Sequence, residues 1–212
     1  MVAGSSPATP ATFQTARREI CGPFCFLRSC PLVYTEPWFH LNSQLMFSIS
    51  IRPMVAADLA PVAEIYRQRS CVENSLHTPF VSEEEWRARL QQMGSDLQCL
   101  VAVANDRVVG HACLITFGSE PRRRHAASLG VVVHSEFRRQ GFARALLTEL
   151  IDTCDSWLGI TRIELEVFAS NPGAIALYRS LGFVEEGRMR GFAYRNGRLE
   201  DAVLMARYEG MG

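Results

Sequence analysis

The fold of this chain is decided by a stretch that reads Gly130-Val131-Val132-Val133, four further residues, and then Arg138-Arg139-Gln140-Gly141-Phe142-Ala143. The β-branched run is typical of a strand, and apolar residues after Gly141 recur at helical spacing. Unpaired N–H groups and the dipole of a helix N-terminus can bind a pyrophosphate. Gly141 lets the backbone approach such a phosphate closely. The stretch predicts an anion-binding loop, although the hexamer alone also fits an ordinary strand-to-helix turn with solvated arginines.

A second pattern follows along the chain. The alternating segment Ile163-Glu164-Leu165-Glu166-Val167 predicts a strand, and the chain then reads Asn171-Pro172-Gly173-Ala174-Ile175-Ala176-Leu177-Tyr178 and Leu181-Gly182-Phe183. With the first stretch, it resembles the GNAT acyl-CoA N-acetyltransferase superfamily. Arg138, Gly141 and Ala143 match the cofactor-loop signature Q/R-x-x-G-x-G/A, and residues 171–183 match N-x-x-A-x-x-L-Y-x-x-x-G-F. The resemblance covers residues 49–208 and is greatest to the YhhY-type bacterial L-amino-acid N-acetyltransferases, through segments such as 71–75, 120–125, 154–158 and 195–197.

Composition narrows the class of protein. The 212 residues are 48% hydrophobic, enough for one core of ordinary domain size. The 22 basic and 22 acidic residues balance, which argues against a nucleic-acid or anionic-membrane binder, and no apolar run approaches transmembrane length. Seven cysteines at irregular spacings suggest neither a disulfide framework nor a metal site. We therefore expect a cytoplasmic protein without metal.

The first 45 residues differ from the rest. They hold five of the ten prolines, no aspartate and no clear periodicity. We expect an N-terminal extension over 1–45, disordered or preceding the true start at Met46, and one GNAT domain over 46–212. A signal peptide is disfavoured because Gly22-Pro23 interrupts its apolar region and Arg28 ends it early.

The coarse order of elements fits an α/β (α+β) GNAT fold, a mixed and mostly antiparallel sheet flanked by helices with splayed central strands. Strands are predicted at 47–52, 97–104, 107–117, 126–134, 161–168, 184–193 and 199–208. Helices are predicted at 56–68, 82–93, 141–157 and 172–181. Ser82 and Glu85 form a capping-box pattern, and Asn105-Asp106 predicts a hairpin turn.

The resemblance implies that acetyl-CoA lies between the strands ending at Val133 and Phe168. Pantetheine would pair with the backbone of Val131, Val132 and Val133, whose groups would also stabilise the developing oxyanion. The pyrophosphate would bind the loop from Arg138 through Arg139, Gln140, Gly141 and Phe142 to Ala143.

The resemblance also assigns two residues near the leaving group. Tyr178 matches the tyrosine that protonates the departing CoA thiolate, although the same position fits a core tyrosine on an amphipathic helix. Asn171 would contact the cofactor or cap its helix. GNAT transfer is direct, so no cysteine nucleophile is needed.

The acceptor amine must be neutral to attack, and an α-amine of pKa about 8 meets this condition more readily than a lysine amine. Glu166 occupies the position of the glutamate base in RimI-type ribosomal-protein acetyltransferases, a departure from the YhhY-type pattern. Glu164 shares its strand face, so the two carboxylates could perturb each other or simply pair with arginines. Ser128 and His125 are weaker candidates for the base, and Ser128 is also a candidate for acceptor binding.

Two further segments concern the acceptor. By likeness to the subfamily, Asn74 is a candidate for binding it. The run Arg122-Arg123-Arg124 could steer a substrate carboxylate or the CoA 3′-phosphate, or could be solvated.

These features predict an acetyl-CoA-dependent N-acetyltransferase acting on the α-amine of a free amino acid or analogue. The partner is thus a small-molecule amine, with neither nucleic acid nor membrane, and family members are often homodimers. Alternatives are a protein N-terminal (RimI-like) acetyltransferase, a phosphinothricin-type acetyltransferase and, in another class, a non-catalytic acyl-CoA-binding module.

Overall fold

The structure is a computed structural model that describes residues 49–80 and 82–210. The predicted extension over 1–45 lies outside the described residues. In chain order the elements are β1 (Ser50–Pro53), α1 (Leu59–Arg67), α2 (Arg69–Val72), α3 (Glu83–Met93), β2 (Leu97–Ala104), β3 (Arg107–Thr116), β4 (Ala126–Val133), α4 (Phe142–Thr153), β5 (Arg162–Phe168), α5 (Pro172–Ser180), β6 (Val184–Arg195) and β7 (Arg198–Tyr208). Short 3₁₀ turns at Ala56–Asp58, Gly94–Asp96 and Ser135–Phe137 and a π-turn at Cys154–Leu158 complete them.

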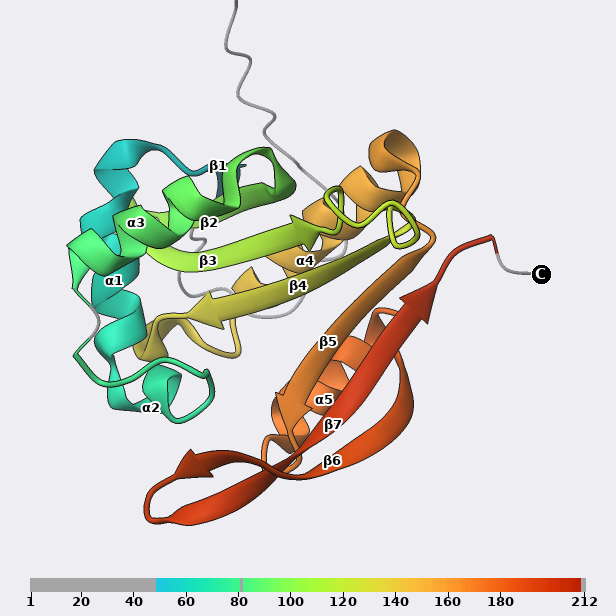
Figure 1. Ribbon diagram of the computed structural model, residues 1–212. Helices are drawn as coiled ribbons and strands as arrows, with labels where there is room; N and C mark the ends of the chain where they lie inside the picture. Colours follow the sequence, from blue (N-terminus) through green and yellow to red (C-terminus); the bar gives the residue numbers. More distant parts are fainter. Residues whose placement is uncertain (1–48, 81, 211–212) are drawn as a thin grey trace, which may run out of the picture. The chain divides into compact units, whose positions relative to one another are not determined.

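The strands form one mixed sheet of seven strands in the order β1-β2-β3-β4-β5-β7-β6. All neighbours are antiparallel except β4 and β5, which run parallel and pair only through Ala126, Ala127 and Ser128. Beyond the pair Ser128–Glu164 the two strands diverge, as Figure 1 shows at the centre of the sheet. The sheet is therefore two half-sheets joined along three residues, which confirms the predicted splay.

Helices cover both faces of the sheet. On one face, α1 and α3 pack over β2 and β3, where Val62, Ile65 and Trp86 bury against Val101 and Val108. On the other, α4 buries five apolar side chains spaced three and four residues apart, namely Phe142, Leu146, Leu147, Leu150 and Ile151. This amphipathic pattern fixes α4 behind the sheet with its N-terminus at the end of β4 (Figure 1).

Local sequence signals determine several element ends. The Ser82 hydroxyl accepts from Glu85 N–H (3.1 Å) and the Glu85 carboxylate accepts from Ser82 N–H (2.7 Å), which confirms the capping box. Asn105 and Asp106 both have positive φ, as the predicted two-residue hairpin turn requires.

Three predictions of element bounds need correction. The segment before Asn74, which lies between the helices predicted at 56–68 and 82–93, contains the additional four-residue helix α2. The helix predicted to 157 ends at Thr153 and continues as the π-turn. The last hairpin extends to Arg195 and Arg198 around an Asn196-Gly197 turn, further than predicted. None of the helices in the described residues combines the length and apolarity needed to cross a membrane.

Candidate active site

The predicted cofactor loop has the geometry of an anion site. Gly141 is the N-cap of α4 with φ +91°, a left-handed conformation, and a Cβ there would meet no atom within 4 Å. Glycine is therefore required by the backbone conformation and not by lack of space. Gly141 is exposed and Arg139, with φ +64°, is exposed beside it. The Phe142 side chain is in the core, so only its backbone faces the loop.

Arg138 points away from the tip of the loop. Its Nε–H donates to the Val133 carbonyl (3.2 Å) and its Nη2 group donates to Cys71 Sγ (3.2 Å). Burial raises the pKa of the Cys71 thiol, and the Arg138 charge opposes that rise. The positive charge predicted for the loop thus comes from Arg139, while Arg138 fastens the end of β4 to α2. Gln140 caps the preceding turn by donating to the Glu136 carbonyl (3.0 Å).

The edge of β4 that faces β5 is free where pantetheine was predicted to pair. Residues Gly110 to Leu114 of β3 hold the other edge of β4 from Leu129 to Val133, while β5 pairs with β4 no further than Ser128. Because His134 N–H bonds the Val109 carbonyl of β3, Val132 also directs its backbone groups to β3, and Val131 and Val133 direct theirs to the β5 side. Val131 has no strand partner there among the described residues, and the Val133 carbonyl accepts from Arg138. Such an edge suits the amide groups of an extended ligand.

Tyr178 lies on α5 with 7% of its surface exposed, and its ring meets that of Phe183 at 5.7 Å. Burial, with a smaller effect from the Cys113 thiol of β3, raises the pKa of Tyr178 to about 12. The hydroxyl is therefore protonated at neutral pH. The same burial raises the pKa of the Cys99 thiol on β2 to about 12, which indicates how strongly this interior disfavours a thiolate. A protonated hydroxyl can donate its proton to a thiolate formed beside it.

The two glutamates of β5 differ in their ion pairs. Glu164, the partner of Ser128 in the last β4–β5 pair, forms ion pairs with Arg123 and with Arg162 (2.9 Å). Pairing with arginines, one of the two expectations for this pair, therefore holds for Glu164. Glu166 is exposed two residues further along β5 and has no ion pair with any described residue. Glu166 is thus the carboxylate available at the open part of the split.

The two weaker candidates for the base lie at different places relative to the split between β4 and β5. Ser128 lies where the strands diverge, whereas His125 precedes β4 at its paired end, away from the cofactor loop. In the arginine run, Arg123 stacks over the Phe117 ring at 3.9 Å in addition to its ion pair with Glu164. Arg122 and Arg124 are exposed. The run is therefore structural in its middle residue and solvated on either side.

Asn74 and Asn171, far apart in the sequence, meet directly. Asn171 Oδ1 accepts from Ala174 N–H (3.1 Å) and so caps α5, while its Nδ2 donates to Asn74 Oδ1 (3.0 Å). This contact places the acceptor candidate beside the loop that follows β5.

The sequence did not predict a buried tyrosine–histidine pair on the face of the sheet that α1 covers. Tyr66 and His111 share a hydrogen bond of 3.2 Å between the tyrosine oxygen and Nδ1, and His111 is 1% exposed. The pKa of His111 is lowered to about 4, first by burial and then by His77. Burial also raises the pKa of Tyr66 well above its ordinary value, with Cys113 as the next cause. The available signal was the largely apolar run around His111, which is buried without interruption from Val108 to Ala112.

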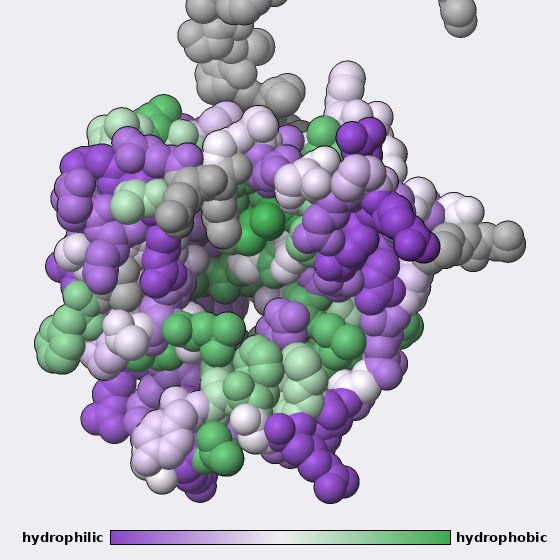
Figure 2. Space-filling view, viewed as in Figure 1, coloured by the Kyte–Doolittle hydropathy of each residue, from purple (hydrophilic) through white to green (hydrophobic). Residues whose placement is uncertain are grey.

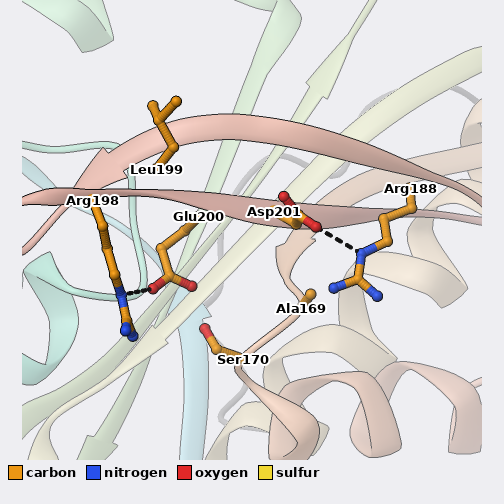
Figure 3. A pocket seen from close by; sticks show the side chains of 7 residues that line it. All are labelled: Ala169, Ser170, Arg188, Arg198, Leu199, Glu200 and Asp201. Carbon is orange, nitrogen blue, oxygen red and sulfur yellow. Dashed lines mark hydrogen bonds and ion pairs between the residues drawn. The ribbon is translucent and has the colours of Figure 1, made fainter.

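The surface of the molecule has a hollow over the split in the sheet and a separate depression near the last hairpin. Figure 2 shows a hollow in the middle of this face, over the gap between β4 and β5, with apolar side chains at its floor and lower border and hydrophilic side chains to either side. A separate open depression of about 420 Å³ lies beside the β6–β7 ribbon (Figure 3). Its arginines are paired with acids, Arg188 with Asp201 (3.0 Å) and Arg198 with Glu200 (2.7 Å). Charge is thus balanced there, and it contains none of the predicted site residues.

Comparison with known proteins agrees with this geometry. The model of the Acetyltransferase (GNAT) family matches residues 62–183. The chain is 40% identical over 162 residues to the L-amino acid N-acetyltransferase AaaT of Escherichia coli (strain K12), covering 76% of this chain and 99% of that protein. Among solved structures, a phosphinothricin acetyltransferase from Sinorhizobium meliloti in complex with AcCoA has a TM-score of 0.69 at 31% identity, covering 77% and 90% of the two chains. A ribosomal-protein-alanine N-acetyltransferase from Brucella melitensis has a TM-score of 0.67 at 32% identity, covering 75% and 99%. The chain belongs to the GNAT family of acetyltransferases and is an N-acetyltransferase.

Proposed function

We propose that this enzyme transfers an acetyl group from acetyl-CoA to the α-amine of a free L-amino acid or a close analogue. The observation that carries the proposal is the combination of the cofactor loop and split sheet with 40% identity over 99% of an L-amino acid N-acetyltransferase. Hydrogen bonds across the mouth of the split, such as that between Asn74 and Asn171, favour a small acceptor over an extended chain.

The cofactor side of the proposal rests on backbone groups. The N–H groups at Gly141, Phe142 and Ala143 would hold the pyrophosphate at the N-terminus of α4, with Arg139 adding positive charge. The β5-facing edge of β4 over Val131, Val132 and Val133 would hold pantetheine, chiefly through Val131, since the Val133 carbonyl already accepts from Arg138. Acetyl-CoA supplies the activated acyl group when bound, and the chain orients it and excludes water.

Two side chains would transfer protons during the reaction. Glu166, exposed on β5, would take the proton from the acceptor amine directly or through water, and Tyr178 would give its proton to the departing thiolate. Asn74 and Ser128 would line the acceptor position, and Asn171 would hold Asn74 in place.

The test is release of free CoA from acetyl-CoA by the purified full chain, over a panel of free amino acids, short peptides and phosphinothricin. Saturable release with particular amino acids supports the proposal and identifies the acceptor. Binding of acetyl-CoA with no release for any amine in the panel would contradict it.

A second candidate is acetylation of a protein N-terminus. Glu166 stands where RimI-type enzymes have their base, and the Brucella relative is a ribosomal-protein-alanine N-acetyltransferase. Release with peptides alone would move the assignment to this activity.

A further inference from the structure

The segment from Gln68 to Asn74 crosses the open end of the split. On the β4 side, Gln68 Oε1 accepts from Ser135 N–H (2.9 Å), and Cys71 Sγ accepts from Arg138 (3.2 Å). On the β5 side, Asn74 accepts from Asn171 (3.0 Å). Because β4 and β5 share only three residue pairs, this segment, which we call the bridge (residues 68–74), is a second connection between the half-sheets.

Arg195, at the end of β6, fastens the far end of the bridge. Its Nη1 donates to the Glu73 carbonyl (2.7 Å) and its Nη2 donates to Ser170 Oγ (2.7 Å). Nη2 also forms an ion pair with Glu200 (3.1 Å), and the guanidinium lies 4.7 Å from the centre of the Phe168 ring. Only 16% of the side chain is exposed. One side chain thus joins the bridge, the loop after β5 and the β6–β7 hairpin.

These contacts leave Arg195 poorly suited to bind a substrate carboxylate itself. A guanidinium grips a carboxylate in a bidentate manner through Nη2 paired with either Nε or Nη1. Both arrangements need Nη2, which already faces Ser170 and Glu200. The charge is balanced by Glu200, whose side chain is 11% exposed. The hydrogen-bonding groups of the Arg195 guanidinium that a carboxylate would need are therefore already bonded to other residues of the protein.

We infer that Arg195 is a positioning residue for the acceptor, an inference that rests on the proposed function. It acts through Glu73 and Ser170, and each of these precedes one member of the Asn74–Asn171 pair. Neither Glu73 nor Ser170 lies in the pyrophosphate loop at 138–143, which the bridge contacts through Cys71, three residues before Asn74. Loss of Arg195 should therefore weaken use of the acceptor while binding of acetyl-CoA is retained.

The experiment compares Arg195→Met with Arg198→Met in the full chain. Arg198 is the matched control because it lies on the same hairpin and pairs with the same Glu200 (Figure 3). Its side chain, however, is 75% exposed. For Arg195→Met we expect the acceptor KM to rise about 10-fold or more, since hydrogen bonds from a charged donor are lost. The Kd of acetyl-CoA, measured without acceptor, should stay within about twofold, by the separation of sites. Arg198→Met should change neither constant.

Ser170→Ala removes one contact of Arg195 and keeps the others, so the acceptor KM should rise less than in Arg195→Met. In the double variant the two effects on the acceptor KM should be less than additive. An unchanged acceptor KM in Arg195→Met, or a parallel rise in the Kd of acetyl-CoA, would overturn the inference.

Amide hydrogen exchange separates this inference from the proposed function. If the wild-type chain acetylates no amine in the panel, the proposed function fails, but exchange can still be measured. Faster exchange at 69–74 in Arg195→Met, with α4 unchanged and Arg198→Met like wild type, would support the positioning role. Equal exchange in all three proteins would refute it.

Discussion

Acidification should destabilise this protein through His111. The histidine is 1% exposed, with Nδ1 hydrogen-bonded to Tyr66 and with Nε2 buried without a partner among the described residues. Charging the ring would place a cation in this interior, so the folded-state pKa falls from the ordinary 6.5 to about 4. The perturbation is a change of pH from 7.5 to 5, compared between wild type and His111→Asn.

The sign and the size follow from the two pKa values. A histidine whose folded pKa is lowered contributes stability above the unfolded pKa of 6.5 and loses it as pH falls through the folded pKa of about 4. The gap between these values corresponds to about 3 kcal/mol of free energy of unfolding, of which about 2 kcal/mol is lost by pH 5.

The assay is urea denaturation at both pH values. The His111→Asn variant keeps a hydrogen-bonding side chain near the Tyr66 hydroxyl but cannot titrate, so its cavity cost is the same at pH 7.5 and pH 5. We expect the free energy of unfolding of wild type to fall by about 2 kcal/mol more than that of the variant between these pH values. His77 remains in both proteins. Equal losses in the two proteins would refute the reasoning that His111 is a buried neutral group.

Three substitutions test the proposed site. Tyr178→Phe should lower kcat by about 100-fold or more with little change in the Kd of acetyl-CoA; full turnover would remove its role as acid. Gly141→Ala, at φ +91°, should cost about 1–2 kcal/mol of stability and raise that Kd, measured by urea denaturation and calorimetry. Gly187→Ala, in open space without positive φ, should do neither, and equal effects would contradict the backbone argument. Glu166→Gln should lower kcat/KM by about 100-fold, whereas Glu149→Gln on the exposed face of α4 should not; similar values for both variants would argue against Glu166 as base.

Much of the architecture could be predicted because its signals are local. The capping box at Ser82, the turn at Asn105-Asp106 and the left-handed Gly141 each depend on residues within one turn of the chain. The periodicity of α4 likewise requires only that one face be apolar. These features, with the pattern at 171–183, were sufficient to identify the family.

The helix α2 could not be predicted in the same way. Four residues are too few to form a stable helix alone, so its existence depends on contacts with distant residues. Gln68 contacts Ser135, and Cys71 contacts Arg138, both more than sixty positions along the chain. A pattern read along the sequence contains no sign of either contact.

The sequence by itself determined the family and the order of the strands and of the longer helices, and it predicted the cofactor loop and the candidate acid, because short-range geometry and spacing specify them. Only the tertiary structure decided that β4 and β5 part after Ser128 and that Arg195 fastens the bridge. It decided as well that Glu164 pairs with arginines while Glu166 has no ion pair with the part of the chain that is described. It also decided that His111 is buried. The physical reason is that pairing partners and burial depend on which residues distant in sequence come together, and that is settled when the half-sheets and helices pack.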